Sequence, residues 1–174
     1  VVNSELVSGL RDLGVDAVGL SGVDGGLLIA ERIPHLGLVA SVVGLRRDLL
    51  DAMPCTYVID HMARVDATAG LDQEPFRKLL ALMAGDERCW VKISGAERLT
   101  AGGAPPYDDV VPYARALIAA APDRVLWGTD WPHPNVRHMP DDGDLVDLLA
   151  AYAPDEAARN RILVANPERL YHFG

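Results

Sequence analysis

Five apolar segments, each followed by a stretch with helical periodicity, restrict the fold of this chain more than any other feature of its sequence. The segments are VDAVGLS (15–21), GLVASVVG (37–44), TYVID (56–60), CWVKIS (89–94) and RVLWG (124–128). They are apolar along almost their whole length, as strands are when both faces of a sheet are covered. A helix between successive strands makes those strands parallel. The sequence therefore predicts an α/β fold built from parallel βα units.

The predicted helices lie between and after these segments. One begins at Ser4, a weak one lies around Leu27–Ile33, and another begins at Pro75 with apolar residues at i, i+3, i+4 and i+7. A helix at 107–121 is expected to carry acidic residues in its first turn, Asp108 and Asp109. Further helices are expected at 46–53, 145–152 and 155–164. No linker interrupts this pattern, so residues 1–174 are predicted to form a single domain.

Composition excludes several classes of partner. The 174 residues are 49% hydrophobic, which is enough for one buried core. The net charge of −9 argues against nucleic acid or an anionic membrane as a partner, and no apolar run is long enough to span a membrane. The two cysteines, Cys55 and Cys89, form no CxxC pair or disulfide framework. We therefore expect a cytoplasmic protein that acts on a small molecule; the oligomeric state is left open.

Polar side chains with catalytic chemistry follow three of the predicted strands. His61 and Arg64 follow the third strand, Arg98 follows the fourth, and Asp130 and His133 follow the fifth. In parallel α/β folds the carboxyl ends of the strands meet at one rim, where ligands bind. We therefore expect these five side chains to converge on one site.

The five side chains suit the hydrolysis of a small carboxylated ester, lactone or amide. Asp130, with tryptophans and prolines around it in the sequence, is expected to act as a general base that activates water. His61 and His133 are expected to polarise a carbonyl group or stabilise an oxyanion. Arg98 and Arg64 offer planar guanidinium groups to a carboxylate of the substrate.

Each of these residues also has a purely structural interpretation. Asp130 would then cap the following loop, and His61 would bond to backbone groups in the core. Arg98 would pair only with a loop acid such as Glu97. The shared rim favours the functional interpretation for Asp130 and His61, and both interpretations stay open for His133 and Arg98.

Several familiar motifs are absent from the sequence. The segment GVDGG (22–26) has neither the GxGxxG spacing of dinucleotide-binding proteins nor the lysine of a phosphate-binding loop. Ser21 and Ser94 do not lie in a GxSxG nucleophile elbow. No HxH, HExxH or Cys/His cluster is present, so no metal ligand and no cofactor are predicted.

Five stretches of the chain resemble the amidohydrolase superfamily, in the amidohydrolase-related group that contains 2-pyrone-4,6-dicarboxylate lactonase-like hydrolases. The stretches are VIDHMARVD (58–66), WVKISGAERL (90–99), 107–135 with its core WGTDWPHP, MPDDGDLVD (139–147) and NPERLY (166–171). The resemblance implies a TIM-type (β/α)8 barrel, of which the five predicted strands would be the fourth to the eighth. It also implies that Asp130 activates the hydrolytic water, that His61 matches the histidine after the sixth strand, and that Arg98 and His133 hold a dicarboxylate.

The beginning of the chain departs from the family pattern. The HxH pair of the first barrel strand is missing, and the chain starts at Val1. Removal of an initiator methionine or the absence of an N-terminal portion would both explain that start. The strand ending at Ser21 also lacks the arginine that such lactonases carry there. These departures indicate that the protein recognises a carboxylate more weakly, and hence that its substrate differs.

The leading hypothesis is a metal-independent lactone hydrolase, because lactonases of this branch resemble metal-independent enzymes. A zinc-dependent hydrolase or decarboxylase is the alternative if an HxH pair lies upstream. A non-catalytic, truncated remnant is another alternative, and an independent five-stranded doubly wound domain is the alternative fold.

Overall fold

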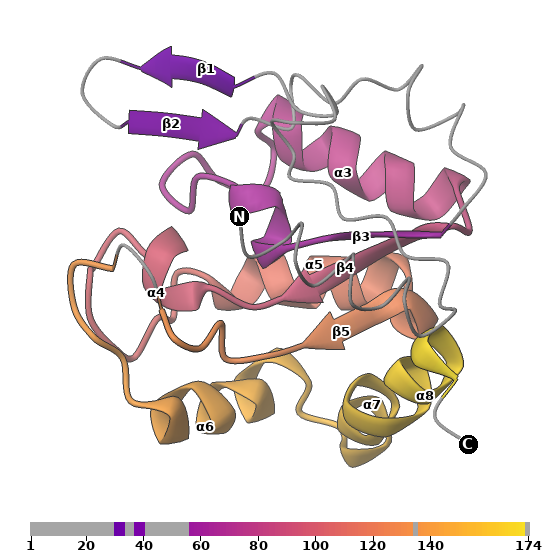
Figure 1. Ribbon diagram of the computed structural model, residues 1–174. Helices are drawn as coiled ribbons and strands as arrows, with labels where there is room; N and C mark the ends of the chain where they lie inside the picture. The colour runs from indigo at the N-terminus through magenta and orange to yellow at the C-terminus, as the bar shows by residue number, and fades with distance from the viewer. Residues whose placement is uncertain (1–29, 34–36, 41–55, 134–135, 173–174) are drawn as a thin grey trace, which may run out of the picture. The chain divides into compact units, whose positions relative to one another are not determined.

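The computed structural model describes residues 30–33, 37–40, 56–133 and 136–172. Contacts divide the chain into two compact units, Val1–Ala52 and Met53–Gly174. In the first unit the described residues form two strands, β1 (Ala30–Ile33) and β2 (Gly37–Ala40), which pair antiparallel (Figure 1).

Two predictions for this first unit were wrong. Ala30–Ile33 is a strand, where the sequence indicated a weak helix around Leu27–Ile33. Gly37–Ala40 is a strand as expected, but among the described residues it pairs antiparallel with β1, where a parallel βα unit was predicted. The reason is the connection: only three residues separate the two strands, and so short a connection joins antiparallel neighbours. The predicted strand at 15–21 and the predicted helices at Ser4 and 46–53 lie outside the described residues.

The second unit contains three parallel strands in chain order, β3 (Tyr57–Ile59), β4 (Cys89–Ile93) and β5 (Val125–Trp127) (Figure 1). Residue 57 of β3 pairs with residue 89 of β4, and residue 91 of β4 pairs with residue 125 of β5. These strands confirm the α/β class and the predicted strands at 56–60, 89–94 and 124–128.

Helices connect the strands as the sequence predicted, and a short helix that it did not predict follows the fourth predicted strand. Helix α3 (Glu74–Gly85) leads from β3 to β4, and α4 (Ala96–Leu99) and α5 (Val111–Ala120) lead from β4 to β5. After β5 come α6 (Asp142–Tyr152), α7 (Glu156–Asn160) and α8 (Asn166–Tyr171), with a π-helical turn between the last two. Helix α6 buries the predicted apolar stripe of Leu145, Leu148, Leu149 and Tyr152.

Helix α5 begins later than the sequence indicated. It starts at Val111, with Pro112 in its first turn, so Asp108 and Asp109 precede the helix. The Asp109 carboxylate instead accepts hydrogen bonds from the Thr100 hydroxyl and the Ala101 backbone N–H, at 2.8 and 2.7 Å. The acid that the sequence assigned to the helix therefore closes the preceding loop.

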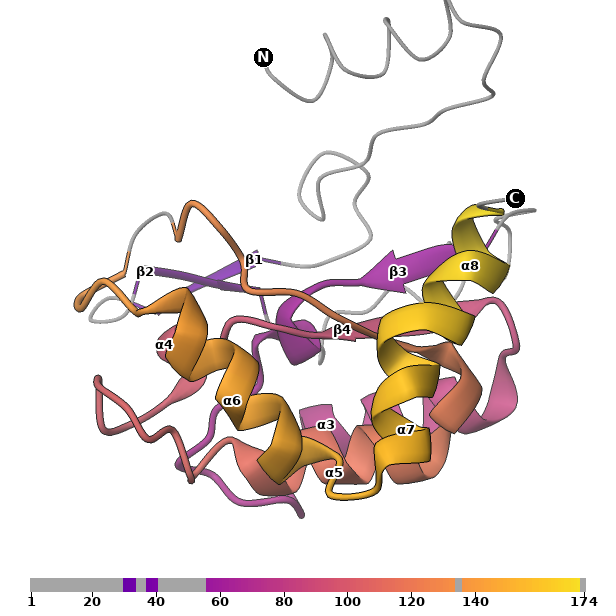
Figure 2. The ribbon, with the colours of Figure 1, turned by 90° about the horizontal axis from the view of Figure 1, so that it is seen from below.

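The core of the second unit lies between the strands and the helices. Figure 2 shows α3, α5 and α6 on the same side of the strands. Alternate residues of β4, Cys89, Val91 and Ile93, are fully buried. Between α3 and α5, the rings of Phe76 and Tyr113 meet edge to face at 5.0 Å. Among the residues that the structure describes, no helix combines the length and apolar character needed to cross a bilayer.

Candidate functional site

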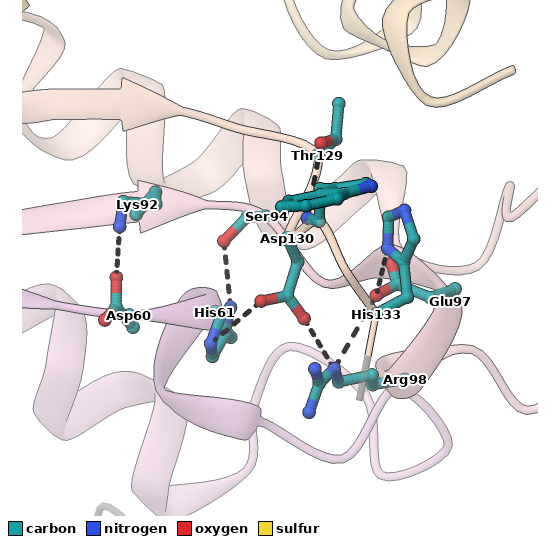
Figure 3. Close-up of polar contacts among 10 residues, drawn as sticks. Asp60, His61, Lys92, Ser94, Glu97, Arg98, Thr129, Asp130 and His133 are labelled. Carbon is teal, nitrogen blue, oxygen red and sulfur yellow. Dashed lines mark hydrogen bonds and ion pairs between the residues drawn. The ribbon is translucent and has the colours of Figure 1, made fainter. Parts of the chain in front are cut away.

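Polar side chains from all three strand ends of the second unit lie together (Figure 3). His61 comes two residues after β3, Ser94 directly follows β4, and Asp130 comes three residues after β5. Arg98 lies on the short helix α4. The structure thus brings together three of the five residues that the sequence placed at this rim, His61, Arg98 and Asp130.

The carboxylate of Asp130 is the centre of the cluster. Its Oδ1 lies 3.4 Å from Nε2 of His61, and its Oδ2 lies 2.6 Å from Nε of Arg98. The side chain is 12% exposed. One acid oxygen therefore faces an imidazole, the other faces a guanidinium, and water has limited access to both.

His61 is held at both ring nitrogens. Opposite the Asp130 contact, its Nδ1 lies 3.0 Å from the hydroxyl oxygen of Ser94. Burial lowers the pKa of His61 below its ordinary value of 6.5, although the carboxylates of Asp130 and Asp60 act to raise it. The imidazole is accordingly neutral near pH 7. With a hydrogen on Nε2 facing Asp130, Nδ1 accepts a hydrogen bond from Ser94.

Gly95 allows the close approach of His61. Its φ of +76° lies in the left-handed region, and a Cβ at this position would stand 3.2 Å from the Cβ of His61. Gly95 immediately precedes α4 and so links the position of Arg98 to that of His61. A side chain here would disturb both partners of Asp130.

His133 is almost completely buried and faces other acids. Its Nε2 lies 3.2 Å from Oδ1 of Asp142, and its Nδ1 lies 3.7 Å from Oε1 of Glu97. Its backbone N–H donates a hydrogen bond of 2.8 Å to the carbonyl of Asp130, which closes the loop between them. Both ring nitrogens thus point at carboxylates of the same network, and the predicted contact between His133 and a substrate stays a prediction.

Arg64 is the outermost of the predicted residues. It ends the turn His61–Arg64, its side chain is exposed, and it forms no ion pair with any residue that the structure describes. A guanidinium in this state is accessible to a ligand, and the predicted contact between Arg64 and a substrate stays a prediction.

Left-handed backbone is common to four of the five predicted residues. The φ values are +53° for His61 and Arg64, +70° for Asp130 and +54° for His133. A non-glycine residue in such a conformation costs about 1–3 kcal/mol, and residues of this kind cluster at functional sites. The backbone therefore supports the functional interpretation of these positions.

Sequence reasoning missed two partners of the predicted residues. Ser94 stands directly after β4, so the rule that pointed to the carboxyl ends of the strands would have found it. Glu97 was considered only as a loop acid that would occupy Arg98. The structure places Arg98 closer to Asp130, at 2.6 Å, than to Glu97, at 3.6 Å. No sequence pattern indicates that the side chain of Glu97 is buried.

Two hollows of different size lie at the strand ends of the second unit. One of about 500 Å³ lies near the ends opposite the cluster, lined in part by Thr56, Trp90 and Arg169. Beside the cluster, a space of about 10 Å³ adjoins Ser94 and Thr129.

A metal ion would find only part of a binding site here. The described residues contain no group of three or more His, Cys, Asp or Glu side chains arranged to hold a metal. His61 and Asp130 would offer two donors, and further ligands would have to come from elsewhere in the protein.

One family model matches the greater part of the chain. The family model described as amidohydrolase matches residues 22–173. A solved structure of an Agrobacterium tumefaciens protein in its apo form is 35% identical, with a TM-score of 0.63 over 73% of this chain and 45% of that chain. An amidohydrolase from Burkholderia multivorans with bound zinc, 20% identical at a TM-score of 0.59, shares the fold.

Two curated relatives are lactone hydrolases by name. The 4-sulfomuconolactone hydrolase of Rhizobium radiobacter is 50% identical over 127 residues, 71% of this chain and 42% of that protein. The 2-pyrone-4,6-dicarboxylate hydrolase of Comamonas testosteroni is 48% identical over 157 residues, 82% of this chain and 52% of that protein. The chain therefore spans about half the length of these relatives.

A second, shorter similarity is to acetylglutamate kinases. The enzyme of Geobacillus thermodenitrificans is 50% identical over 54 residues, which is 30% of this chain and 21% of that protein. This chain is thus similar to proteins of two different kinds.

Proposed function

The chain belongs to the amidohydrolase family, and on that premise we propose that it is part of a hydrolase that opens a small carboxylated lactone with a water molecule activated by Asp130. The position of the Asp130 carboxylate carries this proposal, since it lies at a strand end between His61 and Arg98, at 3.4 and 2.6 Å. The names of the two relatives that are about 50% identical support a lactone as the substrate class.

In the proposed reaction, Asp130 takes a proton from water while the water oxygen attacks the carbonyl carbon of the lactone. The electron pair of the carbonyl bond moves onto its oxygen. The groups proposed to stabilise this charge are His61 and His133, each through an N–H that faces a carboxylate in the structure and would turn toward the substrate. The ring C–O bond then breaks, and the proton held by Asp130 passes to the ring oxygen. The product is a hydroxy acid, and all atoms of the lactone and the water are accounted for.

Arg98 and Arg64 are proposed to hold a carboxylate of the substrate. A guanidinium has five N–H donors, so Arg98 can remain paired with Asp130 and still bind a second anion. Arg64 is exposed at the same rim and forms no ion pair with a described residue. Two cations at one rim would favour an anionic substrate in spite of the net charge of −9.

The proposed architecture is a (β/α)8 barrel in which β3, β4 and β5 are the last three strands. The strands are parallel and in chain order, and α3, α5 and α6 lie on one side of them (Figure 2). A doubly wound sheet would carry helices on both faces. The activity is accordingly proposed for the complete barrel, with the strands that precede β3 in place.

Replacement of Asp130 by asparagine in the complete protein tests the proposed base. We expect hydrolysis of 2-pyrone-4,6-dicarboxylate or 4-sulfomuconolactone to fall about 10²–10⁴-fold, because asparagine cannot accept the proton of the water. The matched control is Asp123→Asn, an exposed acid before the other end of the same strand, which should keep full activity. Activity of the Asp130 variant within about tenfold of the wild type would reject the proposed base.

A zinc-dependent hydrolase or decarboxylase is the second candidate function. The observation that favours it is the facing pair of His61 Nε2 and Asp130 Oδ1, which are two possible donors to a metal. Since the described residues supply no third ligand, no step of the reaction is assigned to a metal. Full activity of the complete protein after removal of all bound metal would exclude this candidate.

A further inference from the structure

Glu97 is a buried acid at the edge of the proposed site. Its side chain is 1% exposed, and neither carboxylate oxygen has a hydrogen-bond partner of good geometry among the described residues. Burial raises the pKa of Glu97, and so does the nearby carboxylate of Asp130, whereas its own backbone N–H, His133 and Arg98 lower it. Burying a carboxylate without hydrogen bonds destabilises a fold, so its retention calls for an explanation.

Two side chains of the proposed site face this carboxylate. Oε1 of Glu97 lies 3.6 Å from Nε of Arg98 and 3.7 Å from Nδ1 of His133. The same Nε of Arg98 lies 2.6 Å from Asp130. Figure 3 shows Glu97 between Arg98 and His133. Glu97 is therefore the group that connects the Asp130–Arg98 pair to His133.

The network continues from His133 to the surface. Beyond Glu97, Nε2 of His133 lies 3.2 Å from Asp142, whose side chain is 49% exposed. Acidic and basic groups thus alternate from Asp130 to Asp142. In such an order each basic group has an acid on either side, and the position of one side chain depends on the next.

We propose that Glu97 is a positioning residue of this site, whose carboxylate holds Arg98 and His133 in place so that a carboxylate of the substrate meets a fixed guanidinium. The proposal rests on the proposed function, in that it assumes an anionic substrate at Arg98. Glu97 does not contact the substrate; it acts through Arg98.

Position along the chain strengthens this inference. Glu97 and Arg98 are neighbours on α4, which has only four residues and begins directly after Gly95. So short a helix gains little stability from its own hydrogen bonds, and its side chains must be fixed by tertiary contacts. Glu97 supplies such a contact next to Arg98.

The test uses the complete protein with Glu97→Gln, which keeps the shape of the side chain and removes its charge. Two probes are compared, 2-pyrone-4,6-dicarboxylate and the same ring without carboxylates, 2-pyrone. We expect kcat/KM for the dicarboxylate to fall about 10–100-fold, mainly through KM, while kcat/KM for 2-pyrone changes less than about threefold. Glu87→Gln, at an exposed glutamate in the turn before β4, is the matched control and should behave as the wild type.

A double-mutant cycle shows whether Glu97 acts through Arg98. In an Arg98→Ala background, Glu97→Gln should cause no further loss of affinity for the dicarboxylate, because the residue through which it acts is already gone. Equal losses for both probes, or additive losses in the cycle, would identify a merely structural acid and overturn the proposal. If Glu97→Gln fails to fold, Glu97→Asp takes its place. Because aspartate retains the charge, this variant should bind the dicarboxylate with an affinity close to that of the wild type.

Binding of the dicarboxylate, measured by calorimetry, separates this inference from the proposed function. A wild type that binds the probe without hydrolysing it would overturn the proposed function alone, and weaker binding by Glu97→Gln would still support positioning. Unchanged binding by Glu97→Gln would overturn the positioning role alone. A wild type that neither binds nor hydrolyses the probe would overturn both.

Discussion

Asp86 and Glu97 are acids that are similarly buried in the second unit, at 8% and 7% exposure of the whole residue, yet their environments differ. Asp86 accepts hydrogen bonds from Arg88 and from the hydroxyl of Tyr57, and these partners, Arg88 first, lower its pKa to about 2. Glu97 has no such bonds, and burial raises its pKa. Burial alone therefore does not decide the charge of an acid; its hydrogen-bond partners do.

Replacement of Asp86 by asparagine should destabilise the protein in a pH-dependent way. A pKa of about 2, against an ordinary 3.8, means that the carboxylate stabilises the fold fully above about pH 4. This contribution is lost as the pH falls from 3.8 to 2. We expect Asp86→Asn to cost about 1–2 kcal/mol at pH 7, since water screens part of the pair with Arg88, which is 33% exposed.

Thermal unfolding measured from pH 7 to pH 2 checks this expectation. The difference between wild type and variant should stay constant down to about pH 4 and then shrink. Asp72→Asn, at an exposed acid before α3, is the control and should show no such difference. A gap that is unchanged at pH 2 would contradict the assigned role of the carboxylate.

At the scale of elements, the turn His61–Arg64 after β3 is the most unusual piece of backbone in the second unit. All four of its residues have positive φ, from +49° to +56°. L-residues pay about 1–2 kcal/mol for this conformation, and only glycine adopts it freely. The turn places His61 against Asp130 and ends with Arg64 at the surface.

Ala63→Gly should therefore stabilise the protein, because Ala63, with a φ of +56°, is not one of the proposed site residues. Relief of the left-handed strain outweighs the greater freedom of glycine in the unfolded chain, for a net gain of about 0.5–1 kcal/mol. Ala81→Gly, at an exposed position of α3, makes the same change in a right-handed helix and should cost about 1 kcal/mol. Chemical denaturation of both variants tests whether their free energies of unfolding change in opposite directions. A loss of stability in Ala63→Gly would show that the backbone at Ala63 is not strained.

At the scale of the whole molecule, the two units differ in how their strands pair. The first unit is Val1–Ala52. Its strands β1 and β2 are antiparallel, whereas the strands of a (β/α)8 barrel are parallel. The family match nevertheless begins at residue 22, inside this unit.

A chain that begins at Met53 tests whether the second unit folds without the first. Since contacts divide the chain at this point, we expect the shortened chain to keep a cooperative thermal transition within a few degrees of the full chain, measured by circular dichroism. A chain that begins at Asp86 lacks β3 and α3 and should not fold. Loss of the transition on removal of residues 1–52 would show that the first unit belongs to the same barrel core.

Sequence reasoning reached the second unit more accurately than the first, for physical reasons. Long apolar strands and amphipathic helices, such as β4 and α6, are dictated by local pattern, and both lie where the sequence placed them. The direction of the strands in the first unit depends on which strands pair. There a connection of three residues joins β1 and β2 as an antiparallel hairpin. The start of α5 depends on a carboxylate that bonds to the preceding loop.

The same contrast between local sequence pattern and tertiary packing holds for the candidate site. The strand-end rule predicted His61, Arg98 and Asp130, because their positions follow from the topology. The environments of His133 and Glu97 follow from how side chains pack around α4 and α6, which no spacing in the sequence encodes.

Left-handed backbone at His61, Arg64, Asp130 and His133 has a consequence for directed evolution. A library selected for heat resistance alone would accumulate glycine and asparagine at these four positions, because either residue relaxes the local geometry. The variants that survive heating best would be those that have discarded the groups proposed for chemistry. A map of enriched substitutions, made without any substrate, would thus include these four positions, together with others of positive φ such as Met62, Ala63 and Tyr107.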